Sequence, residues 1–167
     1  DAGQYERAAS AYLERLKLGG WEEEIYCSLL ELGRLQRRMG TPWPIAMNSL
    51  LSAYDYRPSR LEAIYEVVRE LRELGKFALA YTLSVVPSSI DRSTDWLFVE
   101  REVYQWRMMD ERAICAGAIG HWDEAIGIYR LLLDSGQLPA EEEARVRQNL
   151  DVCGQNLMQQ ATPVGSK

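Results

Sequence analysis

The chain has 167 residues, of which 47% are hydrophobic and 26% charged, and its formal net charge is −6. This is the composition of a folded domain. The acidic balance argues against nucleic-acid binding, which needs a basic surface, and no apolar run approaches the ~20 residues of a membrane span. Three widely spaced cysteines without a CxxC pair argue against a disulfide framework or a zinc site, and predict reduced thiols in a cytoplasmic protein.

Apolar residues recur at three- and four-residue steps along almost every long segment, while glycine and proline fall between these segments. Between residues 61 and 71, for example, Ile64, Val67 and Val68 share one helical face. The periodicity predicts an all-α fold. In chain order, we expect helices over residues 1–18, 22–39, 43–56, 59–74, 76–87, 99–118, 121–135 and 140–159.

A shared pattern occurs in four segments, residues 3–12, 40–51, 75–84 and 120–129. Each has a glycine, an aromatic residue two or three positions later, and an alanine three positions after the aromatic. The alanines are Ala8, Ala46, Ala80 and Ala125. Glycine permits the left-handed conformation that ends a helix, the aromatic ring fills the gap between two helices, and alanine allows them to cross closely. The pattern therefore predicts antiparallel helix pairs.

Ala46 and Ala80 are 34 residues apart, which is the period of the tetratricopeptide repeat (TPR). The stretch LLELG at 29–33 is close to the first-helix motif of that repeat, and Pro58 closes the same unit. The chain thus resembles the TPR family over about residues 1–135. The resemblance implies a superhelical solenoid of antiparallel helix pairs in a single domain, 1–160. Its units would be roughly 1–20, 21–58, 59–98 and 99–138, followed by a capping helix at 139–160 and a flexible tail at 161–167.

The first predicted unit contains only the second helix of a pair. A repeat helix buries its apolar face only against its pair and its neighbours. We therefore expect Tyr5 and Tyr12 to have an uncovered side. Either a missing part of a longer protein or another copy of the chain would cover it, which makes these tyrosines a candidate association surface.

Three longer stretches, residues 19–35, 42–81 and 97–126, are similar to the helical repeat region that follows the catalytic domain in a group of bacterial glycosyltransferases. In that family the sugar chemistry belongs to a separate α/β domain upstream. This chain has neither strand–helix alternation nor a D-x-D motif. The resemblance carries over no catalytic residue, and it implies an accessory piece or a stand-alone relative of a sugar-transfer protein.

Residues that could support catalysis are few. The single histidine, His121, stands in a predicted turn, where we expect it to be solvated. No serine or cysteine has a histidine partner nearby in the sequence, and there is no metal-ligand cluster or glycine-rich phosphate loop. The sequence therefore predicts no enzyme activity, no cofactor and no metal.

Charged and aromatic residues recur on the predicted first helices of the repeats, which line the concave face of such stacks. Side by side they would form a groove of Arg34, Arg37, Glu62, Tyr65, Arg69, Arg72, Arg107 and Asp110. Arginine forks bind carboxylates and phosphates, so this groove would suit an acidic peptide, a phosphorylated segment or an anionic saccharide. The alternative is an ordinary solvated face, since Glu66 and Glu73 lie at helical spacing from Arg69.

An insertion at residues 87–106 lengthens one repeat and contains Trp96, Phe98, Tyr104 and Trp106. These aromatic side chains either pack back on the helices, or Trp96 and Phe98 form an exposed contact surface.

We expect a non-catalytic TPR-like scaffold that mediates association with a protein partner or with itself, accessory to a glycosyltransferase. Two alternatives stay open. The arginine groove could bind a saccharide or other anionic acceptor for a glycosyltransferase, or the chain could be a regulatory binder of acidic peptides. Nucleic acid and membrane are not expected as partners.

Overall fold

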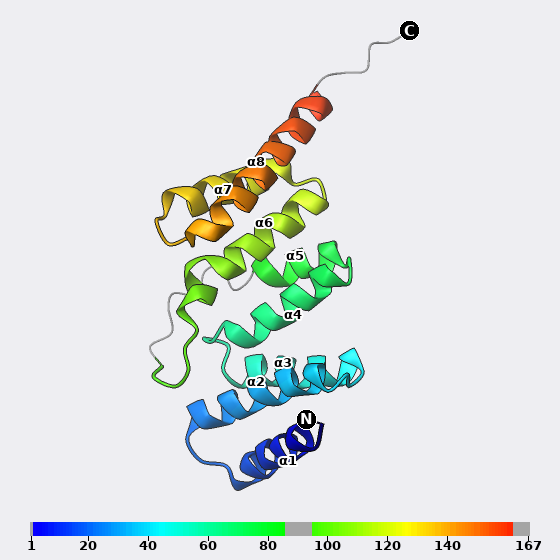
Figure 1. Ribbon diagram of the computed structural model, residues 1–167, viewed down its shortest axis with the longest axis vertical. Helices are drawn as coiled ribbons and strands as arrows, with labels where there is room; N and C mark the ends of the chain where they lie inside the picture. The colour runs from blue at the N-terminus through cyan, green and yellow to red at the C-terminus, as the bar shows by residue number, and fades with distance from the viewer. Residues whose placement is uncertain (1, 86–94, 162–167) are drawn as a thin grey trace. The chain divides into compact units, whose positions relative to one another are not determined.

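A computed structural model describes residues 2–85 and 95–161 of the chain (Figure 1). This part contains eight α-helices, one π-helical stretch and no strand, so the predicted all-α class is confirmed. The elements are α1 (Ala2–Leu18), α2 (Glu22–Arg38), α3 (Trp43–Tyr56), α4 (Glu62–Glu73), α5 (Phe77–Val85), η2 (Val103–Arg107), α6 (Met108–Ala118), α7 (Trp122–Asp134) and α8 (Ala140–Ala161).

The predicted helices match these elements closely, with two differences. The helix expected from residue 59 begins at Glu62. Where a helix was expected from residue 99, the backbone stays irregular through Glu100, and the helical run that follows includes the π-helical stretch η2. Residues 86–87 of the expected fifth helix and residues 162–167 of the expected tail lie outside the described residues.

Contacts divide the chain into two compact units. Unit 1 comprises the described residues up to Val67 and those within 89–101, and unit 2 comprises those within 68–88 and from Glu102 onward. In unit 1, α1 packs on α2, and α2 packs on α3. In unit 2, α5 packs on α6, α6 on α7 and α7 on α8, and η2 contacts α6. Within each unit, successive helices are therefore packing partners.

Three of the turns between these helices have the same geometry. Gly40, Gly75 and Gly120 have φ values of 72°, 71° and 86°, which confirms the predicted left-handed conformation of these glycines. In each turn the next residue donates its N–H to a carbonyl five positions earlier. These bonds are Thr41 to Gln36 at 2.9 Å, Lys76 to Leu71 at 2.8 Å and His121 to Ala116 at 2.9 Å. They satisfy carbonyl groups that a helix end otherwise leaves without partners.

Small residues permit the close packing that follows each of these turns. Ala46, Ala80 and Ala125 are all fully buried, as their place at predicted helix crossings requires. Gly33 of α2 is equally constrained, because a Cβ atom there would lie 2.6 Å from Cγ of Leu50 on α3. The two helices therefore approach more closely than an alanine at position 33 would allow.

Each unit has its own apolar core. In unit 1 the buried apolar residues include Tyr26, Leu30, Leu32, Leu35, Ala46, Leu50, Ala53, Leu61 and Ile64. In unit 2 one cluster contains Trp106, Ala113, Ala116, Ala125, Ile128, Tyr129, Leu132, Leu138, Val146 and Cys153. Cys115 and Cys153 are buried and Cys27 is half-buried, and all three cysteines are free thiols, as predicted.

Helix α1 differs from the others because none of its described side chains is buried. Tyr5 is 37% exposed, and Leu13 and Leu18 are more exposed still. Tyr12 is half-buried.

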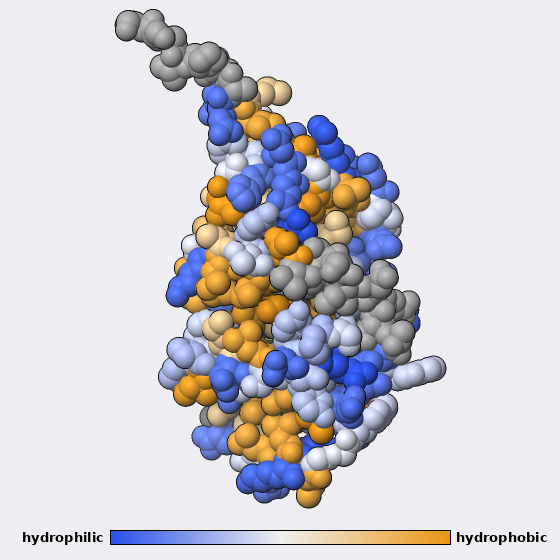
Figure 2. Space-filling view, turned by 180° about the vertical axis from the view of Figure 1, so that it is seen from behind, coloured by the Kyte–Doolittle hydropathy of each residue, from blue (hydrophilic) through white to orange (hydrophobic). Residues whose placement is uncertain are grey.

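Figure 2 shows hydrophobic residues (orange) interspersed with hydrophilic ones (blue) over the face seen from behind. Among the residues that the structure describes, no helix combines the length and apolar character needed to cross a membrane.

Candidate functional site

A cleft of about 510 Å³ opens on the surface of unit 1. Three parts of the sequence line it, namely α1, α2 and the segment just before η2. The lining residues are Tyr12, Cys27, Leu30, Glu31, Arg34, Phe98, Val99 and Glu100. Arg34, Tyr12 and Phe98, which the sequence singled out for different surfaces, therefore line one cleft.

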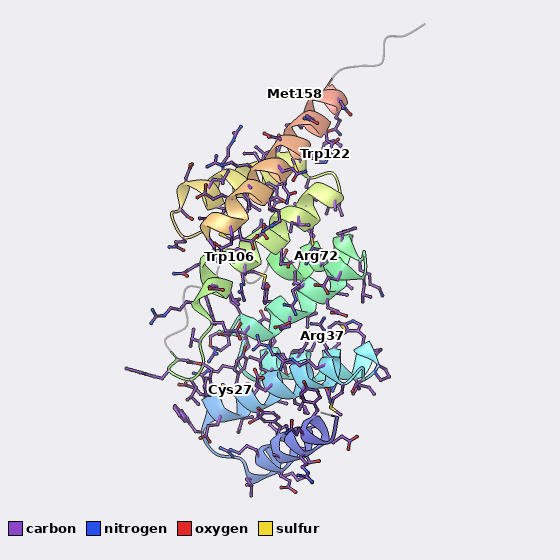
Figure 3. All side chains as sticks on the ribbon, in the orientation of Figure 1. Cys27, Arg37, Arg72, Trp106, Trp122 and Met158 are labelled. Atoms are coloured by element: carbon purple, nitrogen blue, oxygen red, sulfur yellow. The ribbon has the colours of Figure 1, made fainter. Side chains whose placement is uncertain are left out.

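Helix α2 contributes a continuous stripe to this cleft. Cys27, Leu30, Glu31 and Arg34 stand at helical spacings of three and four residues, so their side chains share one face. Gly33 lies off this stripe, against α3. Figure 3 labels Cys27 toward the start of α2 and Arg37 toward its end.

The third wall consists of Phe98, Val99 and Glu100. They end residues 95–100, which we call the anchored segment because buried carboxylates bind its backbone. Glu23 accepts the backbone N–H groups of Trp96 at 3.0 Å and Leu97 at 2.9 Å. Glu62 accepts the backbone N–H of Glu100 at 3.1 Å. Both carboxylates are buried, at 6% and 0% exposure. Because irregular backbone has no helical hydrogen bonds of its own, these contacts hold its path.

Arg60, in the turn before α4, binds the anchored segment from the interior of unit 1. Its side chain is fully buried and donates to the carbonyl groups of Leu97 at 3.0 Å and Phe98 at 3.3 Å. It also donates to both carboxylate oxygens of Glu62, at 3.0 and 2.9 Å, and lies 4.6 Å from the ring centre of Tyr26. A buried charge is tolerated only when it is paired and hydrogen-bonded in this way.

A second arginine fixes the start of the anchored segment. Arg57 donates to both carboxylate oxygens of Asp95 at 2.5 Å. The side chain of Asp95 is only 4% exposed, and Arg60 lies 3.3 Å from it. The hydrogen bonds from Arg57 lower the pKa of Asp95, against the effect of burial.

The anchored segment presents two aromatic side chains to solvent. Trp96 is 89% exposed and Phe98 is 79% exposed. These two side chains therefore lie on the surface and do not pack back on the helices. Phe98 has a φ of 47°, a left-handed conformation that is costly for a residue with a side chain. By contrast, Trp106 is buried in the core of unit 2, and Tyr104 is partly buried. Residues 87–94 of the insertion lie outside the described residues.

Charge in the cleft centres on Arg34, whose side chain is 16% exposed. Its guanidinium group forms ion pairs with three carboxylates, those of Glu31 at 2.9 Å, Glu66 at 2.9 Å and Glu100 at 2.6 Å. Burial opposes its charge, but these partners raise the pKa of Arg34, which stays cationic. Arg37 also approaches Glu66, at 3.5 Å, and lies over the ring of Trp43.

The other predicted groove residues have partners of their own. In unit 1, Glu62 and Tyr65 are buried and do not present their side chains to solvent. In unit 2, the remaining residues each have a partner of opposite charge: Arg69 with Glu73 at 3.9 Å, Arg72 with Glu111 at 2.5 Å, Arg107 with Glu102 at 2.5 Å and Asp110 with Arg145 at 2.8 Å.

Most of these partners were missed by the sequence reasoning, which considered only neighbours within one helix. Arg34 and Glu66 are 32 residues apart, Arg72 and Glu111 are 39 apart, and Asp110 and Arg145 are 35 apart. These separations are close to the predicted repeat period. Aligning the repeats and comparing equivalent positions could therefore have found the pairs.

Reactive groups contribute little to the cleft. Burial raises the pKa of the Cys27 thiol, so its thiolate is disfavoured at neutral pH. His121 is exposed, as expected, and meets the ring of Tyr81 edge-on at 5.0 Å. No group of three or more histidine, cysteine, aspartate or glutamate residues in the described ranges could hold a metal ion. What the cleft offers is apolar contact area beside paired charges.

Comparison with known proteins gives no match: no family model, no curated protein and no solved structure matches this chain.

Proposed function

We propose that this protein is a non-catalytic, TPR-like helical scaffold that binds a protein partner through the cleft of unit 1 and the aromatic side chains beside it. The observation that carries the proposal is the exposure of Trp96 and Phe98 on a segment whose backbone is bound by buried charged groups. Large aromatic side chains on a fixed backbone lose little conformational freedom on binding, and they are the commonest energetic centres of protein interfaces.

The repeat architecture is supported by the three equivalent turns at Gly40, Gly75 and Gly120 and by the buried alanine that follows each of them. Successive helices pack on one another within each unit, as helix-pair repeats do. In such proteins the first helices of the pairs supply the binding face. Helix α2, which is the first helix of its predicted pair, supplies half of the cleft lining here.

The test is a selection of random dodecapeptides displayed on phage against the immobilised protein. We expect the selected peptides to bind a Trp96→Ser, Phe98→Ser double variant at least about tenfold more weakly than the wild type. We also expect the bound peptides to slow the alkylation of Cys27, which lies in the cleft wall of the wild-type protein. Leu131→Ser is the matched control, because Leu131 is 61% exposed on α7 in unit 2. Selected peptides that bind the double variant and the wild type equally well would overturn the proposal.

A second candidate is a saccharide in the same cleft. The cleft combines the ring of Phe98 with the carboxylates of Glu31 and Glu100, and a sugar needs an apolar surface for its ring and acceptors for its hydroxyl groups. Because the chain resembles a repeat region of glycosyltransferases, we propose a sugar-transfer protein as its partner under either candidate function. Calorimetric titration with neutral hexasaccharides tests the second one: heat that the Phe98→Ser variant abolishes would favour it, and no heat would remove it.

A further inference from the structure

The apolar walls and the carboxylates of the unit 1 cleft favour one class of partner over others. The inference drawn from them rests on the proposed function. We propose that the cleft binds a partner segment in which an apolar side chain stands beside a lysine or arginine. The apolar side chain enters between Tyr12, Leu30 and Phe98, and the cation meets Glu31 and Glu100.

The apolar part of the argument comes from the walls. Five of the eight lining residues offer apolar or weakly polar surface: Tyr12, Cys27, Leu30, Phe98 and Val99. A volume of about 510 Å³ is within the range of pockets that bury most of a small ligand. One large side chain with the adjoining backbone of a peptide is a ligand of this size.

The charge part comes from the unequal pairing around Arg34. One guanidinium group serves Glu31, Glu66 and Glu100, and of the three carboxylates only Glu66 approaches Arg37 as well. Glu66 is 6% exposed, whereas Glu31 and Glu100 keep 39% and 32% of their side chains exposed. Their outward oxygens can therefore accept further hydrogen bonds, and a cation is the complementary group.

An acidic ligand fits the same cleft poorly. It would have to compete with three carboxylates for Arg34, and it would approach Glu31 and Glu100 at close range.

The experiment compares two forms of one peptide taken from the dodecapeptide selection. We expect selected sequences to combine leucine, phenylalanine or tryptophan with a neighbouring lysine or arginine. Replacing that cation by norleucine should weaken binding about tenfold, equivalent to two exposed ion pairs. Glu31→Gln with Glu100→Gln should weaken the parent peptide by a similar factor and leave the norleucine peptide unchanged.

Glu141→Gln with Glu143→Gln on α8 makes the same charge change in unit 2 and should have no effect. If the cleft variant does not fold, a salt titration of the wild-type protein with the two peptides tests the same ion pairs. Raising NaCl from 50 to 500 mM should weaken the parent peptide several-fold more than the norleucine peptide, because salt screens exposed charges.

The outcomes separate this inference from the proposed function. Peptides that slow Cys27 alkylation but carry no enriched cation, or are enriched in glutamate and aspartate, would overturn the inference and leave the scaffold proposal standing. Peptides that neither slow Cys27 alkylation nor depend on Trp96 and Phe98 would overturn both.

Discussion

Arg60 is the largest fully buried side chain among the described residues, and its environment explains how a charged group can lie in the interior of a helical unit. Its guanidinium group meets Glu62, the carbonyl groups of Leu97 and Phe98, and the ring of Tyr26. Removing one member of such a network leaves an uncompensated buried charge, which costs far more than an exposed ion pair contributes.

Replacing this arginine, as Arg60→Met, should therefore lower the free energy of unfolding by about 3–5 kcal/mol, measured by urea denaturation. Arg147→Met is the matched control. Arg147 is 61% exposed and pairs with Glu143 on the same helix, so its loss should change stability by less than about 0.5 kcal/mol. Equal effects of the two substitutions would contradict the assigned role of Arg60.

Asp95 predicts a pH dependence with a definite sign. Its hydrogen bonds from Arg57 lower its pKa in the native state, so the native state favours the carboxylate. The resulting stabilisation is complete above the pKa of an unpaired aspartate, about 3.9, and is lost as the pH falls through the lower native value. Asp95→Asn should cost about 1–3 kcal/mol at pH 6, by urea denaturation, and progressively less toward pH 2. A cost that stays constant over this range would contradict the argument.

At the scale of residues, the sequence identified the arginines as candidate binding residues but did not predict their ion-pair partners. Periodicity was used to assign Arg34, Arg72 and Asp110 to helix faces, but each is paired with a residue more than 30 positions away. A single sequence shows which charges share a helix face, and it shows pairing between helices only if the repeat register is already known. The cleft was unpredictable for the same reason, because Phe98 reaches α2 through backbone that has no periodicity.

At the scale of elements, the helices were predictable because their signals are local. Apolar periodicity and the glycines at positions 40, 75 and 120 place most helix ends within three residues of their observed positions. The anchored segment was not predictable. Residues 99 and 100 continue a helical pattern in the sequence. However, Arg60 donates to the carbonyl group of Phe98 just before them, Glu62 accepts the N–H of Glu100, and both bonds hold this backbone in another conformation.

Two helical glycines provide a matched test of packing. Gly33→Ala should lower the free energy of unfolding by about 1–3 kcal/mol, because the new methyl group would meet Leu50 at 2.6 Å. Gly127→Ala in α7 meets nothing within 4 Å and should raise stability by up to about 1 kcal/mol through helix propensity. Thermal and urea denaturation would measure both. A Gly33→Ala variant as stable as the wild type, or more stable, would show that the α2–α3 crossing is not as close as described.

At the scale of the whole molecule, the described chain comprises two compact units with separate apolar cores. The division falls between Val67 and Val68, inside α4, so one continuous helix contributes to both units. Proteins open in cooperative parts of this kind, each with its own free energy of opening.

Destabilising unit 1 should therefore leave helices α7 and α8 of unit 2 largely protected. In Gly33→Ala, amide hydrogen exchange should accelerate about tenfold or more in α2 and α3 and remain near the wild-type rate in α7 and α8, as measured by mass spectrometry. Acceleration by the same factor in all four helices would instead indicate a single cooperative unit.

The anchored segment has a consequence for the evolution and engineering of this protein. Its path is fixed by bonds to its backbone, from Arg60 and to Glu23 and Glu62, and by bonds from Arg57 to the side chain of Asp95. The side chains of Trp96 and Phe98 take no part in these bonds. Those two positions can therefore change identity without altering their own support, and asparagine or glycine at 98 would even relieve the left-handed strain. Under the function proposed above, the segment would act as a recognition loop on a constant frame, and single substitutions at its two exposed positions would change its specificity.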